Sequence, residues 1–222
     1  GSDGGDLKNG YNFNILCPFL ADDEAIGMAG TIAKYVKEGY KVVKVVLSSG
    51  EKSSPHLQES FVKKARYKET DKASDFLGIS EDINLGLKDA KLKEEIRKPF
   101  VEKRLRELIM LNRPEKIYVT SNQDPHPAGD HQAVNKIVLE VVDSLKKHYP
   151  VYAFEVWNII KENHPRMYVD ISEFIDQKVK YIKMFKSQWM YMTTLYLPMW
   201  FRAVYYGRKN NCKYAERFYK LR

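Results

Sequence analysis

The alternation of short β-branched runs with longer segments of helical periodicity restricts the fold of this chain more than any other feature. Over the first 150 residues, apolar runs that read as strands lie at 11–19, 41–48, 83–85 and 116–120, and segments with three- and four-residue apolar spacing separate them. Strands that alternate with helices join through right-handed crossovers into a parallel sheet. The sequence therefore predicts an α/β fold, a Rossmann-like three-layer sandwich whose mostly parallel sheet carries helices on both faces.

The helices are predicted from periodicity and from the residues that end them. Gly39 and Gly78 are expected to end two helices, and Pro114 a third, because glycine and proline interrupt helical backbone. The expected helices span residues 22–38, 57–77, 94–111, 130–147 and 172–190. Further strands are expected at 151–157 and 167–171.

Domain organisation follows from what the sequence does not contain. There is no internal repeat, low-complexity tract or linker rich in Pro, Gly or Ser, so we expect one domain over residues 11–222 with a basic, aromatic C-terminal segment at 181–222. Residues 1–10 contain four glycines and no apolar run, and they read as a cloning remnant or a disordered leader. Two cysteines are too few for a disulfide framework, so reduced thiols and a cytoplasmic location are expected.

Three loops are expected at the carboxyl edge of the sheet, where open α/β folds bind their ligands. They span residues 20–24, 48–56 and 121–131. The first holds Asp22, Asp23 and Glu24 at a junction from strand to helix, where the helix dipole favours negative charge. Two interpretations stay open: a helix cap with an acidic first turn, or part of a functional site.

The third loop concentrates groups that bind metal ions. Asp124, His126, Asp130 and His131 lie within eight residues. A neutral imidazole is a common zinc ligand, and a neighbouring acid orients it and raises its basicity. The alternative is a polar loop with a helix cap at Asp130. Because the first loop brings acids to the same edge, the sequence favours a site.

Six segments, in order, resemble the PIG-L/LmbE family of zinc-dependent N-deacetylases over roughly residues 11–218. The family carries A-H-P-D-D-E-x-x-x-G-G-T after its first strand, and this chain has FLADDEAIGMAGT at 19–31. The other matches are Ser48 to Glu51, the set Arg66, Glu69, Ala73, Leu77 and Gly78, the set Leu85, Gly86 and Asp89, HPAGDH at 126–131, and the ending at 202–218.

The resemblance implies a metal-dependent hydrolase that removes an acyl group, such as acetyl, from an N-acylated amino sugar or a related amide. It implies zinc as the cofactor, with Asp23 and His131 as ligands and Asp22 as the general base. His126 would polarise the amide carbonyl or stabilise the oxyanion. The implied partner is a small N-acyl sugar, either free or phosphorylated, nucleotide-linked or lipid-linked.

Three further residues are implied as substrate contacts. Arg66 and Asp89 occupy positions that the family uses near sugar hydroxyls, although an ordinary surface ion pair is the alternative for them. Arg202 offers donors to an anionic group, since a guanidinium matches phosphate geometry. No feature of the sequence indicates an oligomeric state.

The chain departs from the family pattern at one metal ligand. Leu20 stands where the family has a histidine, and His126 and His131 are five residues apart instead of three. Cys17 is a replacement ligand or, in the simpler interpretation, a strand residue in the core. Alternatives therefore stay open: an active zinc deacetylase, a metal-poor relative that binds a ligand without hydrolysis, or an active enzyme in which Leu20 is an engineered change. A nucleotide-binding Rossmann enzyme is disfavoured, because no G-x-G-x-x-G follows the first strand.

The whole net charge of +8 lies in the last 42 residues. They hold nine Lys or Arg residues, one acid and 12 of the 28 aromatic residues. A basic segment rich in aromatic residues suggests nucleic-acid binding. Here nucleic-acid binding is disfavoured, because the segment matches the ending of the PIG-L/LmbE family itself. We expect its aromatic residues to pack against the domain. Peripheral membrane contact through residues 195–201 is a further interpretation.

Overall fold

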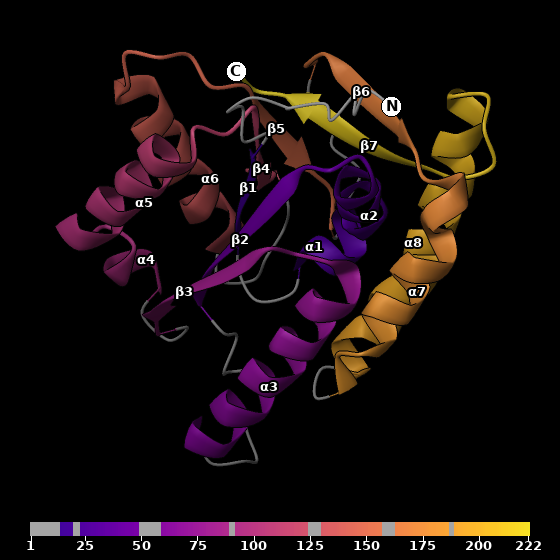
Figure 1. Ribbon diagram of the computed structural model, residues 1–222, viewed down its shortest axis with the longest axis horizontal. Coiled ribbons are helices and arrows are strands. Elements are labelled where there is room, and N and C mark those ends of the chain that lie inside the picture. Colours follow the sequence, from indigo (N-terminus) through magenta and orange to yellow (C-terminus); the bar gives the residue numbers. More distant parts are fainter. Residues whose placement is uncertain are drawn as a thin grey trace, which may run out of the picture.

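The computed structural model describes residues 14–19, 23–48, 59–88, 92–123, 130–156, 163–186 and 189–222. Its strands are β1 (Asn14–Phe19), β2 (Lys41–Ser48), β3 (Glu81–Leu87), β4 (Lys116–Thr120), β5 (Val151–Phe154), β6 (Arg166–Asp170) and β7 (Ala215–Lys220). Its helices are α1 (Asp23–Gly27), α2 (Ala29–Lys37), α3 (Glu59–Leu77), α4 (Leu92–Glu95), α5 (Pro99–Asn112), α6 (Asp130–Ser144), α7 (Ile175–Lys183) and α8 (Trp189–Lys209), with a 3-10 turn at Ser172–Phe174. Figure 1 shows their arrangement.

These strands form one sheet in the order β3-β2-β1-β4-β5-β7-β6. Strands β1 to β5 pair in parallel, whereas β7 runs antiparallel to both of its neighbours. The interior strand β2 is buried from Val42 to Ser48, as a parallel strand covered on both faces requires. The predicted fold class, an α/β sandwich with a mostly parallel sheet, is confirmed.

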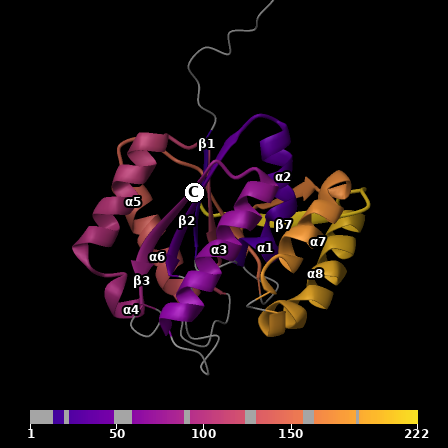
Figure 2. The same cartoon turned by 60° about the horizontal axis from the view of Figure 1, so that its bottom comes forward.

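Alternate residues of β2 enter two separate cores. Val42 and Val46 pack with residues of α1, α2, α3, α7 and α8 on one face. Val43, Val45 and Leu47 pack with α4, α5 and α6 on the other face. Figure 2 shows the sheet between these two helical layers. The two-residue period of a strand thus determines which helices each side chain meets.

Two predicted helices are interrupted in the structure. The helix expected over residues 22–38 is divided into α1 and α2 at Met28, whose φ of −149° is not helical. The helix expected over 94–111 is divided into α4 and α5, and Pro99 begins the second part. The prediction of one continuous helix was wrong there because proline has no backbone N–H and fits only the first turn of a helix.

The C-terminal segment differs most from expectation. The helix expected over 172–190 ends at Lys183, and α8 then runs for 21 residues with Pro198 inside it. Strand β7, which was not predicted, lies between β5 and β6 within the sheet. Within the described ranges, no helix combines the length and apolar character that crossing a membrane requires.

Helix α1 lies close against the end of β5, and Gly27 is the residue that allows this approach. A Cβ atom at Gly27 would lie 2.4 Å from Phe154 Cδ2 and 2.8 Å from the Glu155 carbonyl oxygen. Glycine to alanine in a helix usually stabilises by roughly 0.5–1 kcal/mol. We expect Gly27→Ala instead to lower the free energy of unfolding by about 1–3 kcal/mol, as overpacking does.

Urea denaturation measures this change. Lys180→Ala, at an exposed position of α7, is the control and should stay within about 0.5 kcal/mol of the unmodified chain. A Gly27→Ala variant as stable as the unmodified protein would contradict the close approach of α1 to β5.

Candidate active site

Asp23 and His131 meet at the carboxyl edge of the sheet. Asp23 begins α1, which follows β1, and His131 is the second residue of α6, which follows β4. Since β1 and β4 are neighbouring parallel strands, their following helices begin side by side. His131 Nε2 lies 2.8 Å from Asp23 Oδ2, and both side chains are buried. Which atom donates depends on the tautomer of the ring, and a zinc ligand at Nε2 requires the tautomer that carries its proton on Nδ1.

Hydrogen bonds to β4 hold the start of α6 in place. Thr120 Oγ1 donates to the carbonyl oxygen of His131 at 3.4 Å. Asn135, one turn further along α6, donates from Nδ2 to the carbonyl oxygen of Thr120 at 2.9 Å. His131 is thereby fixed to the end of a buried strand, beside the carboxylate of Asp23.

Of the other predicted site residues, Arg202 is the one whose side chain the structure describes. Asp22, Asp89 and His126, together with Leu20, lie outside the described residues. Arg66 belongs to α3, but its side chain is also outside the described part of the chain. Arg202 lies on α8 and donates from Nη2 to the carbonyl oxygen of Val156 at 2.8 Å. Val156 follows β5, so Arg202 reaches the same edge of the sheet as Asp23 and His131.

The Asp23–His131 pair offers two of the donors that zinc takes. Two ligands about 2.0–2.1 Å from a tetrahedral ion stand about 3.3 Å apart, so these two atoms would separate by about 0.5 Å to hold one. Within the residues that the structure describes, no group of three His, Cys, Asp or Glu side chains forms a metal site. The donor set fits zinc, but the described part supplies only a pair.

Cys17 belongs to the core. Its side chain is fully buried and packs in the cluster formed by β1, α1 and α2. Burial raises the pKa of the Cys17 thiol far above its usual range, and the negative charge of Glu24 raises it further. A metal ligand must be a thiolate. The core interpretation of Cys17 therefore agrees with the structure.

A buried lysine holds the acidic first turn of α1. Lys44 Nζ donates to Glu24 Oε1 and lies 3.2 Å from the Tyr181 hydroxyl, which also donates to Glu24. Lys44 and Glu24 are 1% and 0% exposed. Glu24 therefore supports the turn that presents Asp23. The sequence does contain a signal for this contact: Lys44 interrupts an apolar run in a strand covered on both faces, where a lysine needs a carboxylate partner.

A second buried carboxylate joins the start of α2 to the C-terminal part of the chain. Glu216, on β7, accepts hydrogen bonds from Thr31 N and Thr31 Oγ1, both at 2.6 Å, and from Gly30 N at 3.3 Å. Lys178 on α7 completes the set with an ion pair of 2.5 Å. Because Glu216 lies 185 positions from Thr31 and 38 positions from Lys178 in sequence, no spacing argument could find these contacts.

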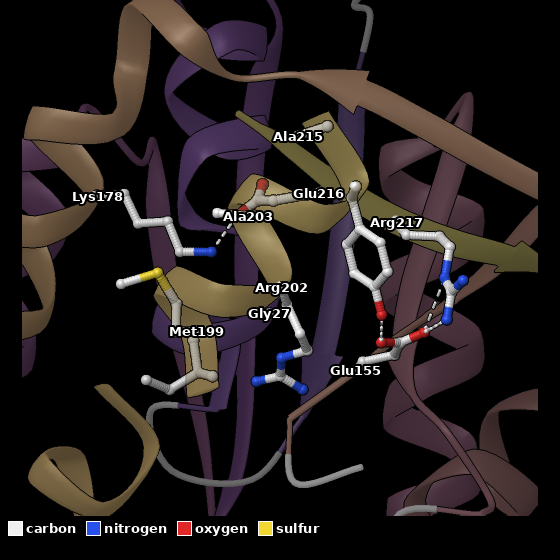
Figure 3. A pocket seen from close by; sticks show the side chains of 11 residues that line it. Gly27, Glu155, Lys178, Met199, Arg202, Ala203, Ala215, Glu216 and Arg217 are labelled. Atoms are coloured by element: carbon white, nitrogen blue, oxygen red, sulfur yellow. Dashed lines mark hydrogen bonds and ion pairs between the residues drawn. The ribbon is translucent and has the colours of Figure 1, made fainter. Parts of the chain in front are cut away.

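A third buried pair lies beside β5. Glu155 Oε1 accepts from Arg217 Nε at 3.1 Å and Arg217 Nη2 at 3.0 Å, and Glu155 Oε2 accepts from the Tyr206 hydroxyl. Burial raises the pKa of Tyr206, and the charge of Glu155 adds to the effect. Figure 3 shows this set on one side of Arg202 and the Lys178–Glu216 pair on the other. Two of the three buried pairs therefore hold helices near Asp23: Lys44–Glu24 holds α1, and Lys178–Glu216 holds the start of α2.

Comparison with known proteins shows which family and which solved structures this chain resembles. A family model described as PIG-L: GlcNAc-PI de-N-acetylase matches residues 21–142, which is more than half of the chain. The diacetylchitobiose deacetylase of Thermococcus kodakarensis is 24% identical over 243 residues, which cover 95% of this chain and 85% of that protein.

Solved structures show the same fold. N,N'-diacetylchitobiose deacetylase from Pyrococcus horikoshii has a TM-score of 0.79 and 21% identity, over 94% of this chain and 84% of that chain. GalB, a 4-carboxy-2-hydroxymuconate hydratase from Pseudomonas putida, has a TM-score of 0.76 and 23% identity, over 94% of this chain and 96% of that chain. At these identities the likeness concerns the fold alone, and the fold carries more than one chemistry.

The Lys44–Glu24 pair gives a prediction about stability. Lys44→Met leaves the Glu24 carboxylate buried without its cation, and we expect a loss of about 3–5 kcal/mol in the free energy of unfolding. The double variant Lys44→Met/Glu24→Gln should recover at least half of that loss. Chemical denaturation of the two single variants and the double variant measures the coupling.

Lys41→Met is the matched control on the same strand. Lys41 pairs with Glu81 at 3.3 Å, but the two side chains are 41% and 49% exposed. An exposed pair contributes little, so this variant should change stability by less than about 1 kcal/mol. Equal losses for Lys41→Met and Lys44→Met would refute the structural role of the buried pair.

Proposed function

Because this chain belongs to the PIG-L: GlcNAc-PI de-N-acetylase family, we propose that it is a hydrolase that removes an acyl group, such as acetyl, from an N-acylated amino sugar or a related amide. The observation that carries the proposal is the buried contact between Asp23 and His131 at the carboxyl edge of the sheet. A relative that matches 95% of this chain is described as a diacetylchitobiose deacetylase. That description supports the proposals that this chain cleaves an N-acyl amide bond and that its substrate is an N-acylated amino sugar.

Zinc is the proposed cofactor, with Asp23 and His131 as its two protein ligands. When bound, the ion would polarise the amide carbonyl as a Lewis acid. Leu20 carries no donor atom at the position where the family has a third ligand. Catalytic zinc usually has three protein ligands, so we expect this chain to bind zinc weakly.

The remaining roles are proposed from the resemblance of the motifs. Asp22 takes the proton of the attacking water as general base, and His126 donates a hydrogen bond to the oxyanion. Arg66 and Asp89 contact the sugar hydroxyls, and Arg202 contacts an anionic group of the substrate. We also propose that residues 11–222 form one domain that acts in the cytoplasm. The position of β7 inside the sheet supports the single domain.

A second candidate function is ligand binding without hydrolysis. The observation that favours it is Leu20, which removes a ligand from the metal site and leaves the acidic turn in place. Zinc content and acetate release separate the two candidates. The hydrolase is supported if the purified chain, supplemented with zinc, retains metal and releases acetate from N-acetylglucosamine or diacetylchitobiose.

Leu20→His tests the proposed ligand set directly. A third donor should raise zinc affinity at least tenfold, about 1.4 kcal/mol, if Asp23 and His131 are the other ligands. Competition with a chromogenic chelator measures the affinity. Leu20→Ile, which adds no donor, is the matched control and should leave it unchanged. No gain for Leu20→His would show that residue 20 is not at the metal site.

Peripheral contact with an anionic membrane is proposed for the outer face of α8. Leu197, Phe201, Val204 and Tyr205 are 64%, 74%, 36% and 50% exposed, and their spacing places them on one face of the helix. Arg208 lies one turn beyond, and basic residues near a membrane are attracted to anionic lipid. A second copy of the chain would bring the same positive charges to this face, which disfavours self-association.

Co-sedimentation with vesicles measures this contact. We expect binding to vesicles that contain phosphatidylserine, loss of binding at high salt, and weaker binding of Phe201→Ser. Leu111→Ser removes a side chain that is 79% exposed on α5 and should bind like the unmodified chain. Equal binding to neutral vesicles would contradict the proposal. A change in oligomeric state caused by Phe201→Ser without lipid would assign the face to a second copy instead.

A further inference from the structure

Strand β6 forms one edge of the sheet. It pairs with β7 in the antiparallel direction, and no other strand of the described residues pairs with it. Figure 1 shows it as the outermost strand beside β7. The free side of an edge strand presents N–H and C=O groups that can pair with a further strand, so proteins usually protect such an edge.

Hydrogen bonds at both ends of β6 show which of its residues face β7. Lys220 N donates to the carbonyl oxygen of Pro165 at 2.8 Å, and Ile171 N donates to the carbonyl oxygen of Tyr214 at 3.0 Å. In an antiparallel pair, alternate residues of each strand exchange these bonds. The odd-numbered residues from 165 to 171 therefore direct their backbone groups to β7.

The even-numbered residues of β6 direct theirs to the free side. These residues are Arg166, Tyr168 and Asp170. Lys34 Nζ donates to the Asp170 carbonyl oxygen at 3.2 Å, which agrees with a carbonyl that points away from β7. A carbonyl oxygen has two lone pairs, so it can accept a second hydrogen bond there. The free side thus offers three evenly spaced residues to another strand.

The sequence of β6, RMYVD, is complementary to itself in the antiparallel direction. Around a twofold axis at Tyr168, Arg166 stands opposite the partner's Asp170, and Met167 stands opposite the partner's Val169. The same axis matches the three outward residues with one another, as a hydrogen-bonded ladder requires. Opposite charges and apolar side chains that face each other across strands stabilise a sheet, whereas like charges destabilise it.

Both charges of β6 are exposed. Hydrogen bonds from the Ser172 hydroxyl at 2.6 Å and the Ser172 N–H at 2.9 Å hold the pKa of Asp170 below its usual range, so the carboxylate stays ionised. Arg166 forms no ion pair with a residue that the structure describes, and its guanidinium lies 5.9 Å from the centre of the Tyr219 ring. A cation and an anion are therefore available at opposite ends of the edge.

We propose that the β6 edge is the contact surface of a twofold-symmetric dimer, in which two copies of this chain join their sheets through β6. Charges at an edge usually prevent pairing. Here the twofold axis sets Arg166 against the partner's Asp170 at both ends of the contact, so the charges favour this one register. The inference goes beyond the proposed function and does not depend on it.

A hollow of about 350 Å³ borders the same edge. Its described lining includes Met167, Tyr168 and Val169 of β6 together with Lys34 and Tyr35 of α2. A second strand beside β6 would cover this hollow and add apolar contact to the backbone pairing. Pairing over five residues is nevertheless short compared with the interface of a permanent dimer, so we expect a dimer that dissociates on dilution.

Charge reversal with mixing tests the proposal by sedimentation velocity over a concentration series. Arg166→Glu alone and Asp170→Arg alone each set like charges opposite each other twice, and each should raise the dissociation constant of the dimer at least tenfold. An equimolar mixture of the two variants should recover the dimer, because unlike charges then meet at both ends. Lys180→Glu, at an exposed position of α7, is the control and should dimerise like the unmodified chain.

The mixture is the decisive readout, because Asp170→Arg also removes the acceptor of the Ser172 hydrogen bonds. Two variants that keep the Tm of the unmodified chain but stay monomeric when mixed would overturn the proposal. So would Arg166→Glu that dimerises as tightly as Lys180→Glu. An unmodified chain that is monomeric throughout the series would overturn it without any variant.

Cross-linking tests the register. Tyr168→Cys, in a Cys212→Ser background, should link two copies on oxidation, because Cα atoms of a hydrogen-bonded antiparallel pair are about 5.5 Å apart and a disulfide spans that distance. Arg166→Cys in the same background is the matched control. Its Cα would lie at least ~13 Å from its counterpart, since four residues separate them along the strands, and it should not link. Non-reducing gel electrophoresis measures both.

Equal cross-linking of the two cysteine variants would refute the register with its axis at Tyr168. A dimeric unmodified chain whose Tyr168→Cys variant forms no link would assign the dimer to another surface and overturn the role of β6.

Discussion

The buried carboxylate of Glu216 makes the contacts that join α2, α7 and the C-terminal strand β7, and the positions of these elements depend on it. It accepts hydrogen bonds from the first turn of α2 and an ion pair from α7, while its own strand lies between β5 and β6. A buried carboxylate is tolerated only when cations and N–H donors replace its water. The start of α2 is thus completed by residues from the end of the chain. Removal of β7 would leave Thr31 and Lys178 without this acceptor.

Much of the fold follows from local patterns, because each strand and its covering helices obey a period that the sequence displays. Lys41–Ser48 and Lys116–Thr120 agree with expectation at both ends for this reason. The C-terminal part differs from expectation for two reasons. Pro198 lies inside the long helix α8, where a proline predicts a break, and β7 mixes charged and aromatic residues instead of showing a clear apolar pattern. Two of the charged residues of β7 pair with distant partners: Glu216 with Lys178, 38 positions away, and Arg217 with Glu155, 62 positions away. No local pattern carries that information.

The meeting of Asp23 and His131 was predictable for a topological reason. Each residue follows the carboxyl end of a strand, and β1 and β4 are neighbours, so the two loops converge whatever their side chains are. The role of Lys44 was not drawn from the sequence, although a lysine inside a buried strand indicates a carboxylate nearby. Arg202 was named from the resemblance of its segment, and its contact with Val156 could not come from spacing because 46 residues separate them.

Buried ion pairs balance charges of the side chains packed near helix α1. The first turn of α1 holds Asp23, and one turn later Ile26 and Gly27 of the same helix border a small cavity that Arg202 also lines. The buried pairs Lys44–Glu24 and Lys178–Glu216 each add no net charge there. The basic C-terminal segment thus contributes one member of each of two buried ion pairs, Glu216 with Lys178 and Arg217 with Glu155.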